Sequence, residues 1–551
     1  RPDFVRDVCD VMNRQEGDDL PVSTFKGWED GTFTTGTSHY ERPAAAIQVP
    51  EWIPENCISC NQCAFVCPHA AIRPFIVTEE EEARAPEGFI CRDLPGPKKG
   101  LKYRIIVSPE DCYGCSICAN VCPAPKKALV MKPIETQLDK QKYWDYAITL
   151  PRKENPMNKF TVRGSQFEPT YFEFSGACAG CGETPYVHLV TNLFGDRMLI
   201  ANATGCSSIY GASAPSMPYC TNAEGQGPAW ANSLFEDNAE FGLGMHLGEI
   251  KLRRRVEEKL NEVLPSSDEN TKTAIEEWIA GKDVGDGTRS RAEKLEAALN
   301  AKVSSHPEYK EILALKDHFI KKSQWIFGGD GWAYDIGFGG LDHVLASGED
   351  INVLVLDTEV YSNTGGQSSK STPAAAIAKF AAAGKKTKKK DLGMIAVSYG
   401  YIYVAQIALG ADMNQAVKAI HEAESYPGPS LIIAYAPCIN HGIKAGMGEA
   451  SAEQKAAVEC GYWCNWRYDP RLLDAGKNPF HLDSREPKGD FRKFLLGEVR
   501  YASLQKLFPQ EAEALFEKTE KDARARRQSY VRMQKSFDLE MQEHQAAAEQ
   551  R

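Results

Sequence analysis

Short apolar runs that stop at polar or glycine-rich turns mark the second half of the chain. Residues 325–327, 351–356 and 431–435 are such runs and predict buried strands. The pattern between them predicts one more strand and two helices, at residues 394–398, 374–383 and 404–421 respectively. Strands that alternate with helices form parallel sheets that are covered on both faces. We therefore predict an α/β fold built on a doubly wound, mostly parallel sheet.

Outside this region the polar pattern is irregular or helical. Residues 247–322 are charged and helix-periodic, which predicts a helical excursion on the surface. Residues 1–50 predict an irregular arm with a short helical start. Three charge runs are expected to be solvated, at residues 79–82, 253–255 and 385–390. The last of these is also a candidate for docking an acidic partner.

The composition narrows the choice of partners and compartment. At 551 residues the chain exceeds one ordinary domain. Its net charge of −11 argues against nucleic acid as a partner, and no apolar run reaches the roughly 18 residues of a membrane span. Seventeen cysteines fall mostly in tight sets, which indicates metal thiolates in a reducing compartment and hence the cytoplasm. The chain starts at Arg1, so we expect a piece of a longer polypeptide.

Two cysteine runs share the pattern C-x2-C-x2-C-x3-C-P, at residues 57–68 and 112–123. This run binds [4Fe-4S] clusters, and its fourth cysteine ligates the other cluster. Zinc ribbons and inert cysteines do not repeat it. We therefore expect two crossed ligand sets, namely Cys57, Cys60 and Cys63 with Cys122, and Cys112, Cys115 and Cys118 with Cys67. The long segment between the runs, residues 74–108, is expected to be a surface insertion.

A third cysteine set is ambiguous from its spacing alone. Cys178 and Cys181 form a C-x2-C pair, and Cys206 follows at a distance. The set could be a redox dithiol, a zinc site or a cluster site. A cluster needs a fourth thiolate, for which the candidates are Cys220, Cys438, Cys460 and Cys464. Cys438 is favoured because it follows the predicted strand at residues 431–435, and strand ends carry ligands in sheet proteins.

Residues 328–366 combine two predicted strand ends. The first is followed by Gly329, Asp330 and Gly331, and the second by Thr358 about 28 residues later, the length of one strand-helix-strand unit. Carboxylate, hydroxyl and carbonyl oxygens suit Mg²⁺, and glycines let backbone N–H groups approach phosphate oxygens. The stretch therefore predicts a magnesium-diphosphate site.

The same stretch resembles the thiamine diphosphate motif, which begins with Gly-Asp-Gly and ends in Asn, here Asn363. Thr358 stands where many thiamine enzymes have Asn. Together with the cysteine runs, over most of residues 1 to about 500, the chain resembles the carboxy-terminal part of pyruvate:ferredoxin (flavodoxin) oxidoreductases. The residue pattern and the resemblance together divide the chain into four segments: an arm (1–50), a two-cluster ferredoxin-like α+β domain (51–165), a thiamine diphosphate and third-cluster domain (166–480), and a C-terminal helical segment (481–551).

The resemblance also implies roles for individual residues. Asp330 and Thr358 would bind Mg²⁺ by side chain and Val360 by its carbonyl. Cys178, Cys181, Cys206 and Cys438 match the ligands of the third [4Fe-4S] cluster, nearest to thiamine. The residues expected to contact the cofactor are Glu183, Cys206, Gly329, Asp330, Gly331, Trp332, Thr358, Glu359, Val360, Tyr361, Ser362 and Asn363. Cys206 and Asn363 are the candidates for a catalytic role.

The implied activity is the oxidative decarboxylation of pyruvate with coenzyme A to acetyl-CoA and CO₂. Electrons would pass through three clusters to ferredoxin or flavodoxin, in a homodimer. The family's glutamate that activates thiamine lies in an amino-terminal domain that we do not find, so we expect the amino-terminal portion of the same enzyme to supply it. Two alternatives are a stand-alone iron-sulfur electron-transfer protein and an oxidoreductase for another 2-oxoacid.

Overall fold

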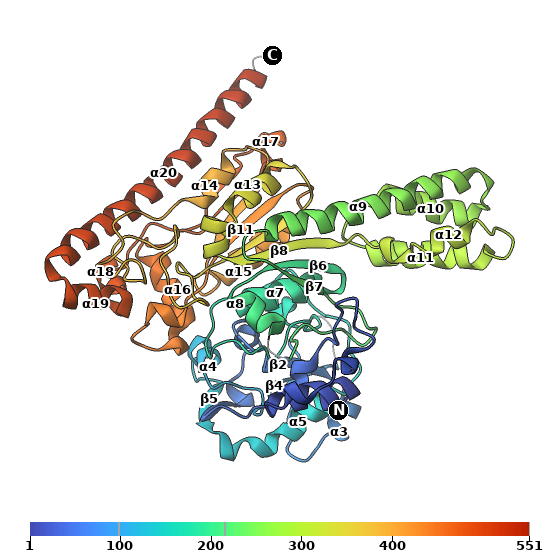
Figure 1. Ribbon diagram of the computed structural model, residues 1–551, viewed down its shortest axis with the longest axis horizontal. Coiled ribbons are helices and arrows are strands. Elements are labelled where there is room, and N and C mark those ends of the chain that lie inside the picture. Colours follow the sequence, from blue (N-terminus) through green and yellow to red (C-terminus); the bar gives the residue numbers. More distant parts are fainter. Residues whose placement is uncertain (97–99, 214–215, 550–551) are drawn as a thin grey trace.

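An eight-stranded sheet forms the centre of the computed structural model (Figure 1), which describes residues 1–96, 100–213 and 216–549. The strand order is β13-β12-β10-β11-β9-β8-β6-β7. All neighbouring pairs are parallel except β10 with β12 and β12 with β13. The strands are β6 (Met198–Ala203), β7 (Ala229–Ser233), β8 (Ser323–Gly329), β9 (Asn352–Asp357), β10 (Tyr403–Ile407), β11 (Ser430–Tyr435), β12 (Trp466–Tyr468) and β13 (Phe480–Leu482).

The central strands are buried on both faces, because successive side chains point to opposite sides. Val353 and Val355 of β9 belong to one hydrophobic core, whereas Leu354 and Leu356 belong to another. The first core includes residues of α13 (Phe338–Ala346), and the second includes residues of α7 (Thr184–Phe194) and α15 (Met413–Glu424). The predicted doubly wound, mostly parallel sheet is confirmed.

Three predicted elements inside the sheet region are wrong. Residues 394–398 lie largely in a helix, α14 (Leu392–Val397), and residues 404–421 begin in β10 before they enter α15. A short apolar run that is buried on every side shows no periodicity, so its sequence does not distinguish a strand from a helix. Residues 374–383 are irregular rather than helical, because Ala375 and Phe380 adopt positive φ. Ala374 and its two neighbours are buried there, so small size, not helix propensity, suits this loop.

The cysteine-rich region contains two small antiparallel sheets, which confirms the predicted α+β architecture. One pairs β1 (Gln48–Trp52) with β5 (Leu129–Pro133), and the other has the order β2 (Ile72–Val77), β4 (Lys102–Val107), β3 (Arg92–Asp93). Segment 74–108 therefore contributes strands and is more than the surface insertion we predicted. Helices α2 (Gln62–Phe65) and α4 (Ile117–Val121) carry cysteines of the two runs.

The acidic run at residues 79–82 is not fully solvated as predicted. It forms α3 (Glu79–Ala83), in which Glu81 is buried. The Glu81 carboxylate closes a capping box with Thr78 and pairs with Lys153. A cap and an ion pair together allow this carboxylate to lie inside.

The predicted helical excursion starts earlier than expected and projects from the sheet (Figure 1). It comprises α9 (Asn238–Val263), α10 (Glu269–Gly281), α11 (Thr288–Lys302) and α12 (Tyr309–Leu313). These helices share a core of their own around Leu260, Trp278 and Leu295. Arg253 is buried, contrary to our prediction for residues 253–255, because it donates to the carbonyl oxygens of Lys282 and His318.

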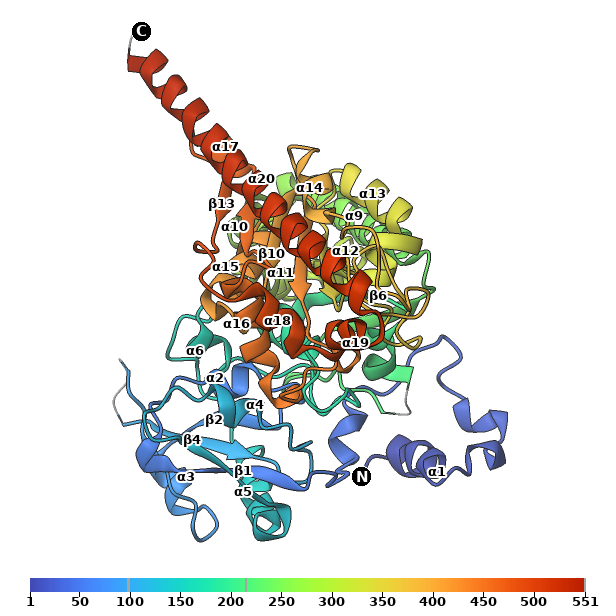
Figure 2. The same cartoon turned by 90° about the vertical axis from the view of Figure 1, so that its left-hand side faces the viewer.

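The C-terminal segment is mostly helical from Phe491 onward, whereas residues 481–490 comprise the end of β13 and irregular backbone. The helical part consists of α18 (Phe491–Gly497), α19 (Val499–Leu507) and α20 (Pro509–Glu549), and the far end of α20 extends beyond the body of the protein (Figures 1 and 2). Phe516 and Tyr530 of α20 pack into the core. Among the described residues, no helix is both long and apolar enough to cross a membrane.

The N-terminal arm has a short helical start, with a π-turn at Val5–Cys9 followed by α1 (Asp10–Asn13). Cys9 is buried beside Phe4 in a small local core. Hydrogen bonds from Gly36 N to Tyr219 O (2.8 Å) and from Ser38 Oγ to Glu173 O (2.8 Å) attach the arm to the body.

Candidate cofactor and cluster sites

Strands β8 and β9 end side by side. They are parallel neighbours, and their register sets Gly329 opposite Leu356. The residues that follow the two strands, Asp330 and Thr358, therefore meet at one edge of the sheet, where α/β proteins bind ligands.

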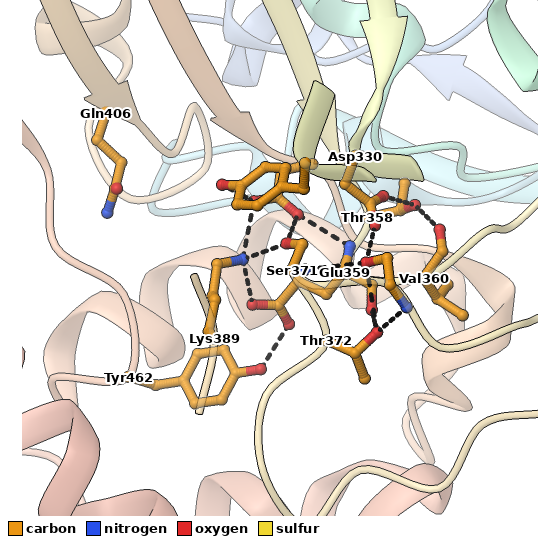
Figure 3. Close-up of polar contacts among 12 residues, drawn as sticks. Asp330, Thr358, Glu359, Val360, Ser371, Thr372, Lys389, Gln406 and Tyr462 are labelled. Atoms are coloured by element: carbon orange, nitrogen blue, oxygen red, sulfur yellow. Dashed lines mark hydrogen bonds and ion pairs between the residues drawn. The ribbon is translucent and has the colours of Figure 1, made fainter. Parts of the chain in front are cut away.

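Three side-chain or backbone oxygen atoms converge at this edge (Figure 3). Thr358 Oγ1 lies 3.1 Å from Asp330 Oδ1 and 3.0 Å from the carbonyl oxygen of Val360. Ser369 Oγ donates to the other carboxylate oxygen of Asp330 at 2.5 Å. Burial, and then the charge of Asp357, raises the pKa of Asp330 well above its usual range. A buried carboxylate held by hydroxyls, with a carbonyl beside it, fits Mg²⁺.

The backbone beside this oxygen set is open at Gly329 and crowded at Gly331. A Cβ on Gly329 would meet only the carbonyl oxygen of Leu356, at 3.8 Å. A Cβ on Gly331 would lie 2.5 Å from the ring of Tyr361, so only glycine fits there. Trp332 is fully buried beneath the turn, and Asn363 is exposed. Bare backbone at Gly329 next to a magnesium-type oxygen set fits a diphosphate.

The carboxylate of Glu359 does not join this oxygen set. It pairs with Lys389 (3.0 Å) and Arg500 (2.9 Å) and accepts a hydrogen bond from Tyr462 Oη. Lys389 also pairs with Asp357 at 2.7 Å and is largely buried. The prediction that residues 385–390 form a solvated turn is therefore wrong for Lys389, whose charge is neutralised inside the protein.

The third cysteine set is assembled from three segments. Gly182 N donates to Pro437 O (3.1 Å), which brings the C-x2-C pair beside Cys438. Cys206 interacts electrostatically with Cys181 and Cys438, and Cys438 with Cys178. The structure thus brings together all four residues of the predicted set. The other three candidates for the fourth ligand have different surroundings: Cys460 and Cys464 lie in the main core, and Cys220 lies near Glu173 and Arg73.

Glu183 lies beside this set and is buried. Burial raises its pKa to about 7, and the nearby Tyr210 hydroxyl opposes that rise. Its charge acts on the thiols of Cys181 and Cys206, whose pKa values are raised first by burial and then by Glu183. A carboxyl group in this environment can gain or lose a proton near neutral pH.

Within each expected ligand set of the two cysteine runs, several thiols lie close enough to interact electrostatically. Burial is the first cause of the raised pKa of Cys60, and the charges of Cys57 and Cys122 contribute to it. Cys118 is affected in the same way by Cys112, Cys115 and Cys67. Backbone N–H groups of Ser59 and Gly114 donate to the sulfurs of Cys57 and Cys112, both at 3.4 Å. Such N–H···S bonds suit thiolates that hold a cluster.

Within the described ranges, no three His, Cys, Asp or Glu side chains lie close enough to hold a single metal ion. The two C-x2-C-x2-C-x3-C-P runs carry the thiolates that an iron-sulfur cluster requires.

Three polar or electrostatic interactions lie between neighbouring sets. Cys63 interacts with Cys118 between the two ferredoxin-type sets. Burial raises the pKa of Cys115 to about 11, and the backbone of Gly180, next to Cys181, is among the groups that oppose this rise. Cys206 Sγ lies 3.3 Å from Ser362 Oγ, in the turn that carries the oxygen set.

Sequence reasoning missed two residues that brace the site. His441, three residues after Cys438, donates a hydrogen bond from Nε2 to the carbonyl oxygen of Thr358 at 2.6 Å. Ser369 bonds Asp330 from 39 residues away. His441 could have been predicted as a site residue, because it follows Cys438 at the end of a strand. Ser369 could not, because a single serine in a polar loop has no distinguishing sequence pattern.

Comparisons with known proteins agree with these features. The description "Thiamine pyrophosphate enzyme, C-terminal TPP binding domain" matches residues 295–434, and "4Fe-4S dicluster domain" matches residues 56–126. A domain of unknown function matches residues 1–44. A pyruvate-flavodoxin oxidoreductase of Klebsiella pneumoniae is 60% identical over 534 residues, which cover 97% of this chain and 45% of that protein. This chain is homologous to the carboxy-terminal portion of the pyruvate:ferredoxin (flavodoxin) oxidoreductases.

Two further relatives extend the comparison. A pyruvate:ferredoxin oxidoreductase of Moorella thermoacetica is 56% identical over 541 residues, covering 97% of this chain and 46% of that protein. The mitochondrial pyruvate dehydrogenase [NADP(+)] of Euglena gracilis is 49% identical over 534 residues, which cover 96% of this chain and 29% of that protein. A solved 2-oxoglutarate:ferredoxin oxidoreductase from Magnetococcus marinus is too distant to support an argument, with a TM-score of 0.28, 14% identity and coverage of 48% of this chain and 65% of that one.

The predicted thiamine diphosphate-binding domain and two-cluster domain are confirmed by these matches. The chain spans about half the length, or less, of the curated relatives that it matches. The exact domain boundaries, magnesium and the third cluster stay predictions.

Proposed function

We propose that this chain forms part of a pyruvate:ferredoxin (flavodoxin) oxidoreductase, which converts pyruvate and coenzyme A to acetyl-CoA and CO₂. In this proposal it supplies the diphosphate half of the thiamine site and three [4Fe-4S] clusters. The observation that supports it best is the contact of Cys206 Sγ with Ser362 Oγ. That contact joins a candidate cluster directly to the candidate magnesium-diphosphate site.

The proposal gives each oxygen ligand a task. Asp330, Thr358 and the carbonyl oxygen of Val360 hold Mg²⁺, and their burial keeps water from competing for it. Bound thiamine diphosphate supplies the electron sink that decarboxylation of a 2-oxoacid requires. The backbone at Gly329 binds the diphosphate, and the remaining proposed contacts are Glu183, Cys206, Gly331, Trp332, Tyr361, Ser362 and Asn363. The backbone of Glu359 shapes the turn, while its carboxylate braces it.

The three cysteine sets form a path for single electrons. Oxidation of pyruvate releases two electrons, whereas ferredoxin accepts one at a time, so clusters in series can separate them. The interactions at Ser362, Gly180 and Cys63 support the following order: the Cys178 set first, then the Cys112 set, then the Cys57 set. Ferredoxin or flavodoxin would dock near the last of these.

The rest of the active site is proposed to come from the amino-terminal portion of the enzyme. That portion would supply the glutamate that activates thiamine and the groups that bind the pyruvate carboxylate. We also propose a homodimer. A cytoplasmic location suits the many thiolates, which need a reducing compartment.

The test is a cofactor and activity assay on the complete enzyme. We expect about 12 iron atoms per chain, as three four-iron clusters require, bound thiamine diphosphate and Mg²⁺, and coenzyme A-dependent reduction of ferredoxin or flavodoxin by pyruvate. About eight irons without thiamine would instead indicate an electron-transfer protein. Preference for another 2-oxoacid would leave the cofactor sites standing and overturn the substrate.

A further inference from the structure

Ser362 lies between the oxygen set and the third cysteine set. Its Oγ is 3.3 Å from Cys206 Sγ on one side and 3.4 Å from Thr358 Oγ1 on the other. Thr358 Oγ1 in turn contacts the carboxylate of Asp330. A continuous chain of polar contacts therefore runs from the buried carboxylate to a cysteine sulfur through one serine.

The chemistry of the sulfur sets the direction of this hydrogen bond. A cysteine that binds iron is a thiolate and has no proton to donate. The hydroxyl of Ser362 is then the donor to Cys206 Sγ.

Asn440 ties Ser362 to a second cysteine of the set. Its Nδ2 donates to the carbonyl oxygen of Ser362 (3.3 Å) and lies 3.6 Å from Cys438 Sγ. The backbone N–H of Asn440 donates to the same sulfur at 3.5 Å. The position of Ser362 is thus fixed against sulfurs from two separate segments.

We propose that Ser362 raises the reduction potential of the third cluster by donating a hydrogen bond to Cys206 Sγ. This inference rests on the third cluster of the proposed function. Reduction makes a cluster more negative, and hydrogen bonds to its sulfurs stabilise that charge, so they shift the potential upward. Ser362 is a tuning and positioning residue, and it links the first electron acceptor to the turn that carries the magnesium ligands.

The test is a redox titration of the complete enzyme in the absence of pyruvate and coenzyme A. The reduction of each cluster is monitored by its electron paramagnetic resonance signal. Ser362→Ala is expected to move the midpoint potential of one of the three cluster signals downward. The other two signals and the iron content stay as in the wild type. Ser362→Thr keeps the hydroxyl and is expected to restore the potential. Ser368→Ala, in the same loop, is the matched control and shifts none of the signals.

The outcomes separate the two proposals. A third signal whose potential is the same in Ser362→Ala and the wild type would overturn the role of Ser362. Equal shifts in the Ala and Thr variants would do so too, because the hydroxyl would not be the cause. Absence of a third cluster from the wild-type enzyme would overturn the proposed function instead.

Discussion

The guanidinium of Arg500 lies 2.9 Å from the carboxylate of Glu359, and both side chains are buried. Arg500 belongs to α19, whereas Glu359 stands between Thr358 and Val360 with a φ of 60°. Left-handed backbone is unfavourable for a residue with a Cβ unless its surroundings hold it. The C-terminal helical segment therefore holds in place the turn that carries two of the proposed magnesium ligands.

Replacing Arg500 with Met should destabilise both the protein and the turn. The change leaves the Glu498 carboxylate, 2.6 Å from Arg500, without this partner and removes one of the cations beside Glu359. Removing one partner of a buried pair costs about 3–5 kcal/mol. We expect a lower Tm and weaker binding of thiamine diphosphate, measured by thermal unfolding and by cofactor titration.

The matched control for this variant is Arg524→Met on α20. Arg524 pairs with Glu520 one turn away, and its side chain is 77% exposed. Exposed pairs contribute little to stability. The control should keep the wild-type Tm and cofactor affinity. If both variants behaved alike, the bracing role of Arg500 would be wrong.

The sequence predicts the parts of the site that lie next to strand ends. Asp330 and Thr358 each follow an apolar run, so the local sequence pattern predicts both the strand and the proposed magnesium ligand at its end. Cys438 is favoured among four cysteines for the same reason, and the structure places it beside Cys181 and Cys206. Parallel pairing of neighbouring strands then brings these residues to one edge.

The sequence does not predict the contacts that brace the site. Glu359 and Arg500 are 141 residues apart, and a single arginine in a charged helical segment has no pattern that marks it as buried. Lys389 looks solvated among its neighbouring lysines until Asp357 and Glu359 are placed around it. Strand β10 is missed because burial on both faces removes the alternation that identifies a strand.

Asp330→Asn should abolish the magnesium site and leave the clusters intact. The substitution keeps the size of the side chain but removes the charge that the proposed Mg²⁺ requires. Loss of a residue that only hydrogen-bonds a metal ligand already weakens metal binding about 10–100-fold. Because Asp330 is proposed to be a ligand itself, we expect at least about a 100-fold loss of Mg²⁺-dependent thiamine diphosphate binding. Iron content and cluster spectra should match the wild type. Loss of cluster signals in this variant would show that Asp330 does not act as a magnesium ligand alone.

Cys438→Ser should remove one cluster of three. Because the other two sets draw no ligand from this segment, iron should fall from about 12 to about eight atoms per chain. Cys464→Ser is the comparison variant, since Cys464 is buried in the main core away from the set. It should keep all the iron. Iron analysis and cluster spectra check both variants, and the reverse result would make Cys464 the fourth ligand.

His188 predicts how the stability depends on pH. It is buried in α7, with its Nε2 3.2 Å from the side-chain amide of Asn192. Burial, and then the charge of Arg73, lowers its pKa to about 3 from the ordinary 6.5. The unfolded chain therefore binds a proton that the folded chain does not between pH 6.5 and 3, so stability falls as the pH drops through this range.

At pH 5 this one residue should lower the free energy of unfolding by about 2 kcal/mol relative to pH 7.5. His188→Gln cannot take up the proton, so the difference in Tm between pH 7.5 and pH 5 should be smaller than in the wild type. Because each variant is compared with itself, any general loss of stability cancels. His343→Gln, on the exposed side of α13, should keep the wild-type difference. An unchanged difference in His188→Gln would mean that His188 is protonated in the folded protein, and that its burial does not exclude the charge.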